Sequence, residues 1–217
     1  MKIVNSILIS SALALLVACG GGSSGGTTPT ADNNPQPEGG IGRTGKALAL
    51  GPIATFGSVV VNGVRYDTSS ATFTINGAPG SQDDLRVGQV VRVSGTIDDD
   101  GVGGDADEVE FDDNVTGPIE SIEPATGQIV VMGQIVLITP ETSFDDSISP
   151  ASIDGLAEDD IVEVSGLVDA EGRITATRIE SKAGEPELEV LGVVSNLNAG
   201  GFLFEVNGLV VDYSAAT

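Results

Sequence analysis

The sequence predicts an all-β protein made of tandem, small, five-stranded barrels. Three observations carry this prediction: short alternating runs of β-branched residues, tight-turn dipeptides between those runs, and landmarks that recur after about 70 residues. No long amphipathic helical pattern interrupts the runs. Small β-sandwiches are the alternative fold, because short antiparallel strands can close in either way.

The amino terminus has the pattern of an export signal. A short basic start precedes the apolar stretch Ile7–Val17, which is too short for a membrane span of about 20 residues. The stretch ends in Leu16-Val17-Ala18-Cys19, which resembles the lipobox of bacterial lipoproteins. This resemblance implies that residues 1–18 are a lipoprotein signal peptide and that Cys19 carries acyl chains such as palmitate. Because Gly20 and not Asp follows the cysteine, it also implies the outer membrane. An ordinary signal peptide ending near a buried cysteine is the alternative.

Residues 19–46 are predicted to be a disordered, lipidated tether. Their composition is mainly Gly, Ser, Thr, Pro, Asn and Asp, and Ile41 is their only large apolar side chain. Such a segment cannot bury enough surface to offset the entropy lost on ordering. Two or three acyl chains at Cys19 would attach the protein firmly to the membrane. A loop packed on the first barrel is the alternative.

Three repeats are predicted after the tether. Gly51-Pro52-Ile53 recurs as Gly117-Pro118-Ile119, and residues 62–72 recur as residues 207–217. These landmarks divide the folded part into a first repeat at residues 47–115, a second at 116–183 and a partial third at 184–217. The third repeat holds about half of a sheet, which leaves strand edges open. We therefore expect the chain to continue beyond Thr217, with a genuine truncation or a partner strand as alternatives.

The first three strands of each repeat are predicted to form a meander. In the first repeat, apolar runs lie on either side of Asn62-Gly63, and a two-residue turn is favoured there because both positions accept a positive φ. The same two-residue turn is predicted at Asn207-Gly208 in the third repeat. In the second repeat we expect the turn at Gly133-Gln134, between strands at residues 129–132 and 135–138.

A short helical turn and a two-strand hairpin are predicted to complete each repeat. The segments 84–88 and 155–159 lie where a short helix or 3₁₀ turn would join strand three to strand four. The runs 90–93 and 161–164 then carry one charged residue among β-branched neighbours, as a half-buried strand requires. This layout is that of a barrel of the oligonucleotide/oligosaccharide-binding (OB) type.

Three stretches resemble the tandem repeats of the family called domain of unknown function 5666, namely residues 56–67, 85–95 and 172–180. The resemblance covers approximately residues 50–217. It implies an exported bacterial lipoprotein with several β-rich repeats, and it brings no activity and no catalytic residues. The second repeat departs from the pattern because it lacks Asn-Gly at its first hairpin, which argues against equal ligand capacity in the copies.

The charge of the chain excludes several functions. It carries 32 acidic and 9 basic side chains, a formal charge of −23, and no His. An acidic body repels phosphate backbones, so nucleic acid is not expected as a partner. Without imidazole, a His-dependent triad and the usual kind of zinc site are excluded as well, and we expect no enzymatic activity.

One acidic turn is a candidate calcium site. Carboxylate-rich loops around glycines suit Ca²⁺, and the candidate ligands here are Asp98, Asp100, Asp105 and Asp107. The turn lacks the closing Glu of an EF-hand, and the second repeat has only an ordinary acidic turn at residues 169–172. A solvated hairpin tip is therefore the favoured interpretation, with no cofactor, and Ca²⁺ is the alternative.

Aromatic side chains are the other candidate for a binding face, since they could form a platform for sugar or peptide. The candidates are Tyr66, Phe73, Phe111, Phe202 and Phe204. Phe73 recurs as Phe144 in the second repeat, as a core position would. Core packing is therefore the favoured interpretation of these residues.

Two classes of function follow from the sequence. The first is a non-catalytic binding or adhesion-like module, held on the membrane through Cys19, whose partner is a polysaccharide or another envelope protein. The second is a structural spacer whose stacked repeats lift a further carboxy-terminal domain away from the membrane. We favour the binding module, because Asn-Gly hairpins and acidic turns line one end of each repeat.

Overall fold

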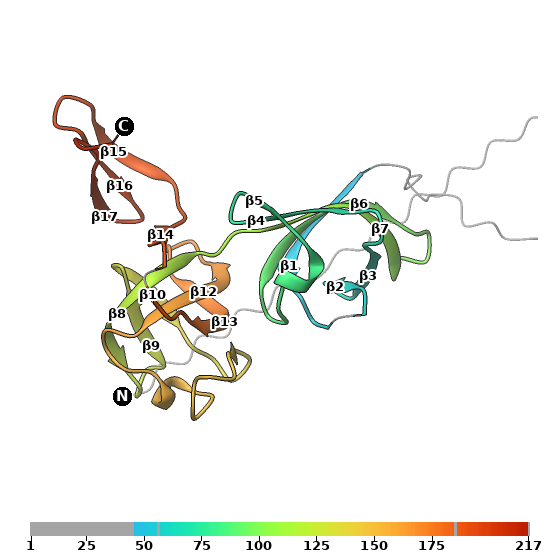
Figure 1. The fold of residues 1–217 in the computed structure, drawn as a ribbon, viewed down its shortest axis with the longest axis horizontal. Coiled ribbons are helices and arrows are strands. Elements are labelled where there is room, and N and C mark those ends of the chain that lie inside the picture. The colour runs from blue at the N-terminus through green and yellow to red at the C-terminus, as the bar shows by residue number, and fades with distance from the viewer. Residues whose placement is uncertain (1–45, 56, 185, 217) are drawn as a thin grey trace, which may run out of the picture. The chain divides into compact units, whose positions relative to one another are not determined.

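The structure is a computed structural model that describes residues 46–55, 57–184 and 186–216. All of these residues belong to one unit, which spans residues 40–217. Within it, two seven-stranded sheets and one three-stranded sheet follow one another along the chain (Figure 1). The predicted signal peptide, Cys19 and nearly all of the predicted tether lie outside the described residues. No helix among the described residues is long and apolar enough to span a membrane.

The first barrel is built from five principal strands. They are β1 (Ala47–Pro52), β2 (Val59–Val61), β3 (Val64–Asp67), β6 (Val90–Ile97) and β7 (Gly103–Phe111). The order in the sheet is β1-β6-β7-β3-β2, and a bridge between Ile53 and Val61 brings the chain after β1 against β2. The β3–β7 pair is parallel and the other pairs on this path are antiparallel. This order, with its parallel third and fifth strands, is that of an OB-type barrel.

The segment between strands three and four carries a small hairpin and a helical turn. It consists of β4 (Thr72–Ile75), β5 (Ala78–Gly80) and the 3₁₀ helix η1 (Gln82–Asp84). The β4 strand pairs in parallel with β7, and Asn76 and Gly77 form its turn with φ values of 46° and 72°. A 3₁₀ turn is present between strands three and four as the sequence predicts, but it begins two residues before the predicted segment 84–88, and the buried Leu85 follows it directly.

The second barrel repeats the same topology. Its strands are β8 (Val115–Glu123), β9 (Gln128–Val131), β10 (Gln134–Leu137), β12 (Ile161–Val168) and β13 (Ile174–Ser181). The order β10-β9-β8-β12-β13 is closed by the parallel pairing of β10 with β13. Between strands three and four lie β11 (Ser143–Phe144) and the 3₁₀ helix η2 (Ile153–Gly155). The prediction of an all-β protein with tandem small barrels is therefore confirmed.

Each barrel has its own hydrophobic core, which explains why the pattern of alternating residues repeats. The first core includes Val59, Tyr66, Val91, Val109 and Phe111. The second core is aliphatic and includes Ile119, Ile129, Val136, Val164 and Ile179. Because successive strand residues face opposite sides of a sheet, these positions alternate with exposed ones along most strands.

An asparagine side chain fixes the first hairpin of the first and third repeats. Asn62 has a φ of 52°, and its amide donates a hydrogen bond of 3.0 Å to the carbonyl oxygen of Leu50. A Cβ atom on Gly51 would lie 2.5 Å from Asn62 Oδ1, so the repeated glycine makes room for this side chain. In the third repeat, Asn207 donates to the carbonyl of Leu191 at 3.1 Å.

The second barrel places a methionine at this position, and here the predicted turn is wrong by one residue. The turn consists of Met132 and Gly133, with φ values of 48° and 73°, and not of Gly133 and Gln134. The Met132 side chain covers Gly117, where a Cβ atom would lie 2.3 Å from Met132 Cγ. A positive φ is uncommon for methionine, so the residue gives no turn signal in the sequence.

The last described segment forms a separate three-stranded sheet. It contains β15 (Val194–Asn198), β16 (Leu203–Val206) and β17 (Leu209–Asp212) in the order of a simple meander. Before it, β14 (Glu189–Val190) pairs with the start of β8 in the second barrel. These strands occupy the places that the first three strands of the other repeats hold in the repeated sequence.

Candidate functional site at the junction of the two barrels

Three hydrogen bonds join the first barrel to the second. The backbone amide of Val90 donates to Ser165 Oγ at 2.8 Å, and Gln89 Nε2 donates to Glu163 Oε1 at 3.5 Å. In the other direction, Arg178 Nη1 donates to the carbonyl oxygen of Val87 at 3.2 Å. Gln89, Glu163 and Ser165 are all buried. The start of β6 is therefore held against β12 and β13.

Gly88 makes this close approach possible. Its φ is 92°, and a Cβ atom there would lie 2.8 Å from the carbonyl oxygen of Thr177 in β13. Glycine is thus required for two reasons. An L side chain disfavours this φ, and the backbone oxygen of Thr177 leaves no space for a Cβ atom. The glycine belongs to the turn that the sequence predicts before β6, but the sequence does not show what packs against it.

Ionised groups gather on the second-barrel side of the junction. Lys182 Nζ lies 2.6 Å from Glu163 Oε2 and 3.4 Å from Glu180 Oε2. Burial raises the pKa of Glu163 and outweighs the opposing effect of Lys182. Burial alone would lower the pKa of Lys182, but the hydrogen bond and charge of Glu163, with the charge of Glu180, raise it. The Lys182 ammonium therefore stays charged beside Glu163 and Glu180.

Asp113 is the most enclosed carboxylate of the described residues. It is 0 % exposed, and its Oδ2 accepts a hydrogen bond of 2.7 Å from the Thr116 hydroxyl. Its Oδ1 is buried without a hydrogen-bond partner. Burial raises the pKa of Asp113, and the hydrogen bond from Thr116 and the charge of Lys182 only partly oppose that rise. An unpaired buried oxygen of this kind is costly when the group is ionised.

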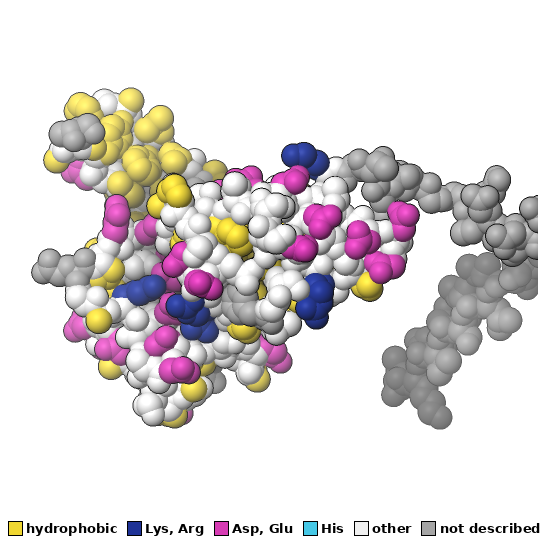
Figure 2. Space-filling model, turned by 45° about the vertical axis from the view of Figure 1, so that its right-hand side comes forward, with side chains coloured by type: hydrophobic (Ala, Val, Ile, Leu, Met, Phe, Trp, Pro, Cys, Tyr) yellow, Lys and Arg dark blue, Asp and Glu magenta, His cyan; other side chains and the backbone are white. Residues whose placement is uncertain are grey.

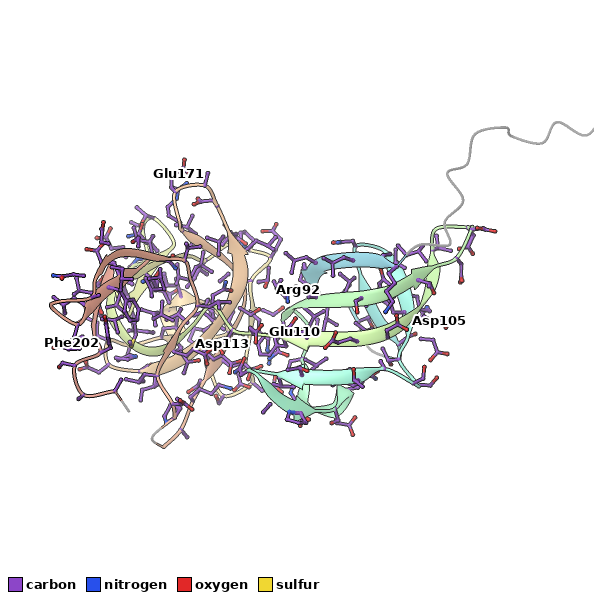
Figure 3. All side chains as sticks on the ribbon, turned by 90° about the horizontal axis from the view of Figure 1, so that it is seen from above. Arg92, Asp105, Glu110, Asp113, Glu171 and Phe202 are labelled. Carbon is purple, nitrogen blue, oxygen red and sulfur yellow. The ribbon has the colours of Figure 1, made fainter. Side chains whose placement is uncertain are left out.

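A groove lies beside these residues and is lined from both barrels. Its cavity volume is about 310 Å³. The lining residues are Leu50, Val90, Arg92, Glu110, Asp112, Asn114, Gly166, Leu167, Val168 and Leu191. Figure 3 shows Arg92 and Glu110 close to Asp113, whereas Asp105 lies at the other end of the first barrel.

The groove is lined by both aliphatic and polar side chains. Leu50, Leu167, Val168 and Leu191 are exposed although they are apolar. Arg92 and Glu110 form an ion pair across β6 and β7. Exposed aliphatic side chains around a few polar groups are typical of a surface that binds another molecule.

A second hollow lies on the outer face of the first barrel. Arg65 points outward from β3 and donates to Ser58 Oγ at 2.9 Å, and Asp67 accepts from the amide of Ser69 at 2.8 Å. The cavity volume is about 580 Å³, and the lining is mostly polar. Asp98 and Asp105 line the same hollow.

The predicted calcium ligands are distributed along the β6–β7 hairpin. Asp98 and Asp100 lie in its turn, where Asp100 Oδ1 accepts from the amides of Val102 and Gly103 at 2.9 and 3.3 Å. Asp105 and Asp107 lie on β7, and Asp107 forms an ion pair with Lys46 at 3.3 Å. Across the described residues, no group of three or more His, Cys, Asp or Glu side chains is placed to hold a metal ion.

The candidate aromatic residues divide between core and surface. Tyr66 and Phe111 are buried in the first core, and Phe73 packs against it. Phe202 is exposed, and both it and Phe204 contact Tyr213 with ring centroids 5.7 Å apart. Core packing, which the sequence favoured, thus holds for the first barrel, whereas in the third sheet Phe202 is exposed and Phe204 is partly buried.

The groove and its junction residues were not predicted from the sequence. Leu50, Leu167 and Leu191 come from strand or linker positions far apart in the chain, and only the docking of the barrels brings them together. The one available signal was an apolar residue at an outward-facing strand position, as in Leu48 and Leu50 beside Ala49.

Fold and site together define a protein of two OB-type barrels that share a buried polar junction. Residues 45–110 and 116–180 match the family described as domain of unknown function (DUF5666), and the two matches cover more than half of the chain. The chain therefore belongs to this family, and the resemblance stated from the sequence is confirmed. Neither a curated protein nor a solved structure matches the chain.

Proposed function

We propose that the protein is a non-catalytic binding module of the bacterial cell envelope, anchored in the outer membrane through lipidated Cys19. The observation that carries the binding role is the groove at the barrel junction, with its exposed aliphatic walls. The lipobox pattern at residues 16–19 supports the anchor. The absence of His from the whole sequence supports a role without acid–base catalysis by imidazole.

The lining of the groove favours a protein partner over a polysaccharide. Sugar rings bind through their flat apolar faces, which stack on aromatic rings, whereas the groove is lined by Leu and Val. The sequence contains no Trp. Aliphatic walls around an ion pair suit an apolar peptide segment that also carries a polar or charged group. The expected partner is therefore an extended segment of another envelope protein.

Site-specific photocrosslinking in native cells tests the binding role. A photoreactive residue at position 50 or 167 should form an adduct with one envelope protein, because both positions line the groove. The matched control is position 48, which is exposed on the same strand but lies outside the groove lining. The purified partner should then bind with a saturable affinity that Leu191→Asp weakens at least tenfold. Equal adducts at positions 48 and 50 would count against the groove.

The anchor has its own test. The native protein, extracted with detergent, should have a mass that corresponds to a chain starting at Cys19 plus its acyl chains. The variant Cys19→Ser should lose those chains and leave the membrane fraction. Retention of residues 1–18 without acylation would contradict the proposal.

A structural spacer is the second candidate function, and the hydrogen-bonded junction favours it. Three direct hydrogen bonds between the barrels resist bending at the connection. A spacer should keep its role in cells when Leu50 and Leu167 are changed to Asp, and should lose it when one barrel is deleted. A binding module should lose its partner with the surface variants alone.

A further inference from the structure

The groove at the barrel junction contains an open strand edge. β8 pairs with β12 only as far as Val164, although β12 itself continues to Val168. The last three residues of β12, namely Gly166, Leu167 and Val168, all line the groove. On one side these residues pair with β13. Among the described residues, no strand pairs with their other side.

Alternation along β12 identifies the backbone groups at this edge. In antiparallel pairing, the amide and carbonyl of one residue point to the same neighbouring strand, and those of the next residue point the other way. The Asn114 amide donates to the Val164 carbonyl oxygen at 2.9 Å, and the Gly166 amide donates to Asn114 Oδ1 at 2.7 Å. Val164 and Gly166 therefore face this edge, and Val168 does too. The Val168 amide and the carbonyl oxygens of Gly166 and Val168 are left there without a partner strand.

The first barrel shows what covers this edge when strand one is longer. There, strand one extends to Ala47, which lies opposite Gly95, the counterpart of Gly166 in the repeated sequence. In the second barrel, the chain before β8 is held by the first barrel instead, where the Asp113 amide donates to Asn76 Oδ1 at 3.1 Å. The edge is therefore open because these residues connect the two barrels.

The charges of the groove indicate a basic occupant. Glu110 is already paired with Arg92, but Asp112 has no ion pair among the described residues. Burial, followed by the charge of Glu110, raises the pKa of Asp112, so a cation beside it would be stabilising. On the face shown in Figure 2, Asp and Glu side chains outnumber those of Lys and Arg. A second copy of this chain is disfavoured, because its formal charge is also −23.

We propose that a basic, extended segment of a partner protein binds in the groove as an added strand on Gly166–Val168. The segment runs antiparallel to β12, as strand one does to strand four in both barrels. One of its residues exchanges two hydrogen bonds with Val168, and the residue two positions later donates its amide to the Gly166 carbonyl oxygen. Its apolar side chains contact Leu50 and Leu191, which line the groove, and a Lys or Arg side chain pairs with Asp112. This inference rests on the proposed function and adds the mode of recognition and the chemistry of the partner.

Two peptides of equal charge test the hydrogen bonding. The probe is a short capped peptide of alternating valine and lysine, and the control is the same peptide methylated at every backbone nitrogen. The full chain is titrated with each peptide at physiological ionic strength. The probe should bind at least roughly tenfold more tightly, because unmade backbone pairs leave buried groups unsatisfied. General attraction to the acidic chain is equal for the two peptides and cancels in the comparison.

Hydrogen exchange locates the bound peptide. The Val168 amide should exchange fast in the free protein and slowly once the probe is bound. The Asp169 amide is the internal reference, because it donates to the Arg173 carbonyl oxygen at 2.9 Å and is protected without peptide. Slower exchange at Val168, with no change at Asp169, would place the peptide on the open edge of β12.

Two variants of Val168 separate the backbone from the side chain. Val168→Pro removes the edge amide, whereas Val168→Thr keeps the amide and has a side chain of similar shape. Proline fits a strand edge whose amide is not used in the sheet, and unchanged exchange of the Asp169 amide shows that β12–β13 stays folded. Val168→Pro should weaken binding of the probe about tenfold, and Val168→Thr should keep it within about threefold.

A variant of Asp112 tests the charge of the occupant. Asp112→Asn should weaken binding of the probe about threefold more than Asp99→Asn does. Asp99 is the matched control, because it lies in an exposed turn and its substitution removes the same charge. Equal effects of the two variants would reject Asp112 as the partner of the basic side chain.

Strand addition would be overturned by equal binding of the two peptides, by no binding of either, or by equal binding to the Val168→Pro and Val168→Thr variants. Slow exchange of the Val168 amide before peptide is added would also overturn it. The edge would then be covered by the chain itself in a monomer, or by a second copy in a dimer.

The crosslinking at positions 50 and 167 tests the proposed function separately. Adducts that persist in the Val168→Pro variant would keep that function and reject strand addition. Missing adducts in the native protein would reject the function, whatever the peptides do.

Discussion

At the residue scale, the turn asparagines show how one side chain can join two strands. Asn62 supplies a left-handed backbone at the hairpin and a donor for Leu50 on β1. A non-glycine residue other than Asn or Asp adopts that backbone at a cost of about 1 kcal/mol. The repeated glycine at position 51 then follows from the space that this side chain needs.

Asn62→Ala is therefore expected to lower the free energy of unfolding by about 1–2 kcal/mol, because it loses both the hydrogen bond and the backbone preference. Asn62→Gly keeps the backbone preference and should cost about half as much. Urea denaturation monitored on the first barrel measures both. Equal losses for the two variants would show that the positive φ contributes nothing.

Asp113 is expected to make the stability of the second barrel depend on pH. Burial raises its pKa in the folded state above the unfolded value of about 4, so its protonated form favours folding. This stability is present below the unfolded pKa and is lost as the pH rises through the folded pKa. The melting temperature should consequently rise as the pH is lowered from 7 towards the ordinary carboxyl range. Asp113→Asn should raise it at pH 7 and reduce the dependence.

Other carboxylates also contribute to the pH dependence of stability. Glu163, Asp112 and Glu189 have pKa values raised by burial and act in the same direction as Asp113. Asp145 has a lowered pKa, mainly through its hydrogen bonds from Ser147, so its contribution is lost as the pH falls below the usual carboxyl range. The matched control is Asp99→Asn in an exposed turn. An identical pH profile for Asp113→Asn and the wild type would contradict the assignment.

At the scale of elements, the turn before β6 connects the two barrels. Gly88→Ala places a methyl group 2.8 Å from the Thr177 carbonyl oxygen, so β6 must move away from β13. Gly63→Ala is the matched control, because Gly63 also has a positive φ of 80° but nothing within 4 Å of the added atom. Gly88→Ala should lower the free energy of unfolding more than Gly63→Ala does, by about 1–3 kcal/mol beyond the backbone cost. Thermal unfolding of both variants measures this difference.

The difference between the two glycine variants is the informative quantity. Both variants place an alanine in the left-handed region, and the free-energy cost of that backbone conformation cancels in the comparison. Only Gly88→Ala should also increase hydrogen exchange at the Val90 amide, which bonds to Ser165 across the junction. Equal destabilisation by the two variants would mean that the barrels do not press on each other at this point.

The elements that the sequence predicts are those whose signal is local. Asn62-Gly63, the β-branched runs and the repeated Gly-Pro-Ile are enough to place the meander and the hairpin in each barrel. The turn at Met132-Gly133 was misplaced because methionine carries no turn preference. β14 was missed because its pairing with β8 depends on a contact between repeats. The groove has the same origin, so periodicity within one repeat cannot reveal it.

At the scale of the whole molecule, stability is expected to be unequal along the chain. Each barrel closes on its own core, and the junction hydrogen bonds join them. The third sheet has three strands among the described residues, and its apolar side chains Val194, Leu197 and Val210 are exposed. Regions with few buried apolar contacts open with low free energies, close to those of fraying ends.

Native-state hydrogen exchange should show this hierarchy directly. The amides of β6, β7, β12 and β13 should exchange only through global unfolding, and those of β15–β17 should exchange orders of magnitude faster. Ser165→Ala leaves the Val90 amide without its acceptor, which costs about 1–3 kcal/mol, and should speed exchange in β6 and β12 together while leaving β16–β17 unchanged. If exchange became faster in β6 alone, the two barrels would unfold independently of each other. The rigidity that a spacer requires would then be absent.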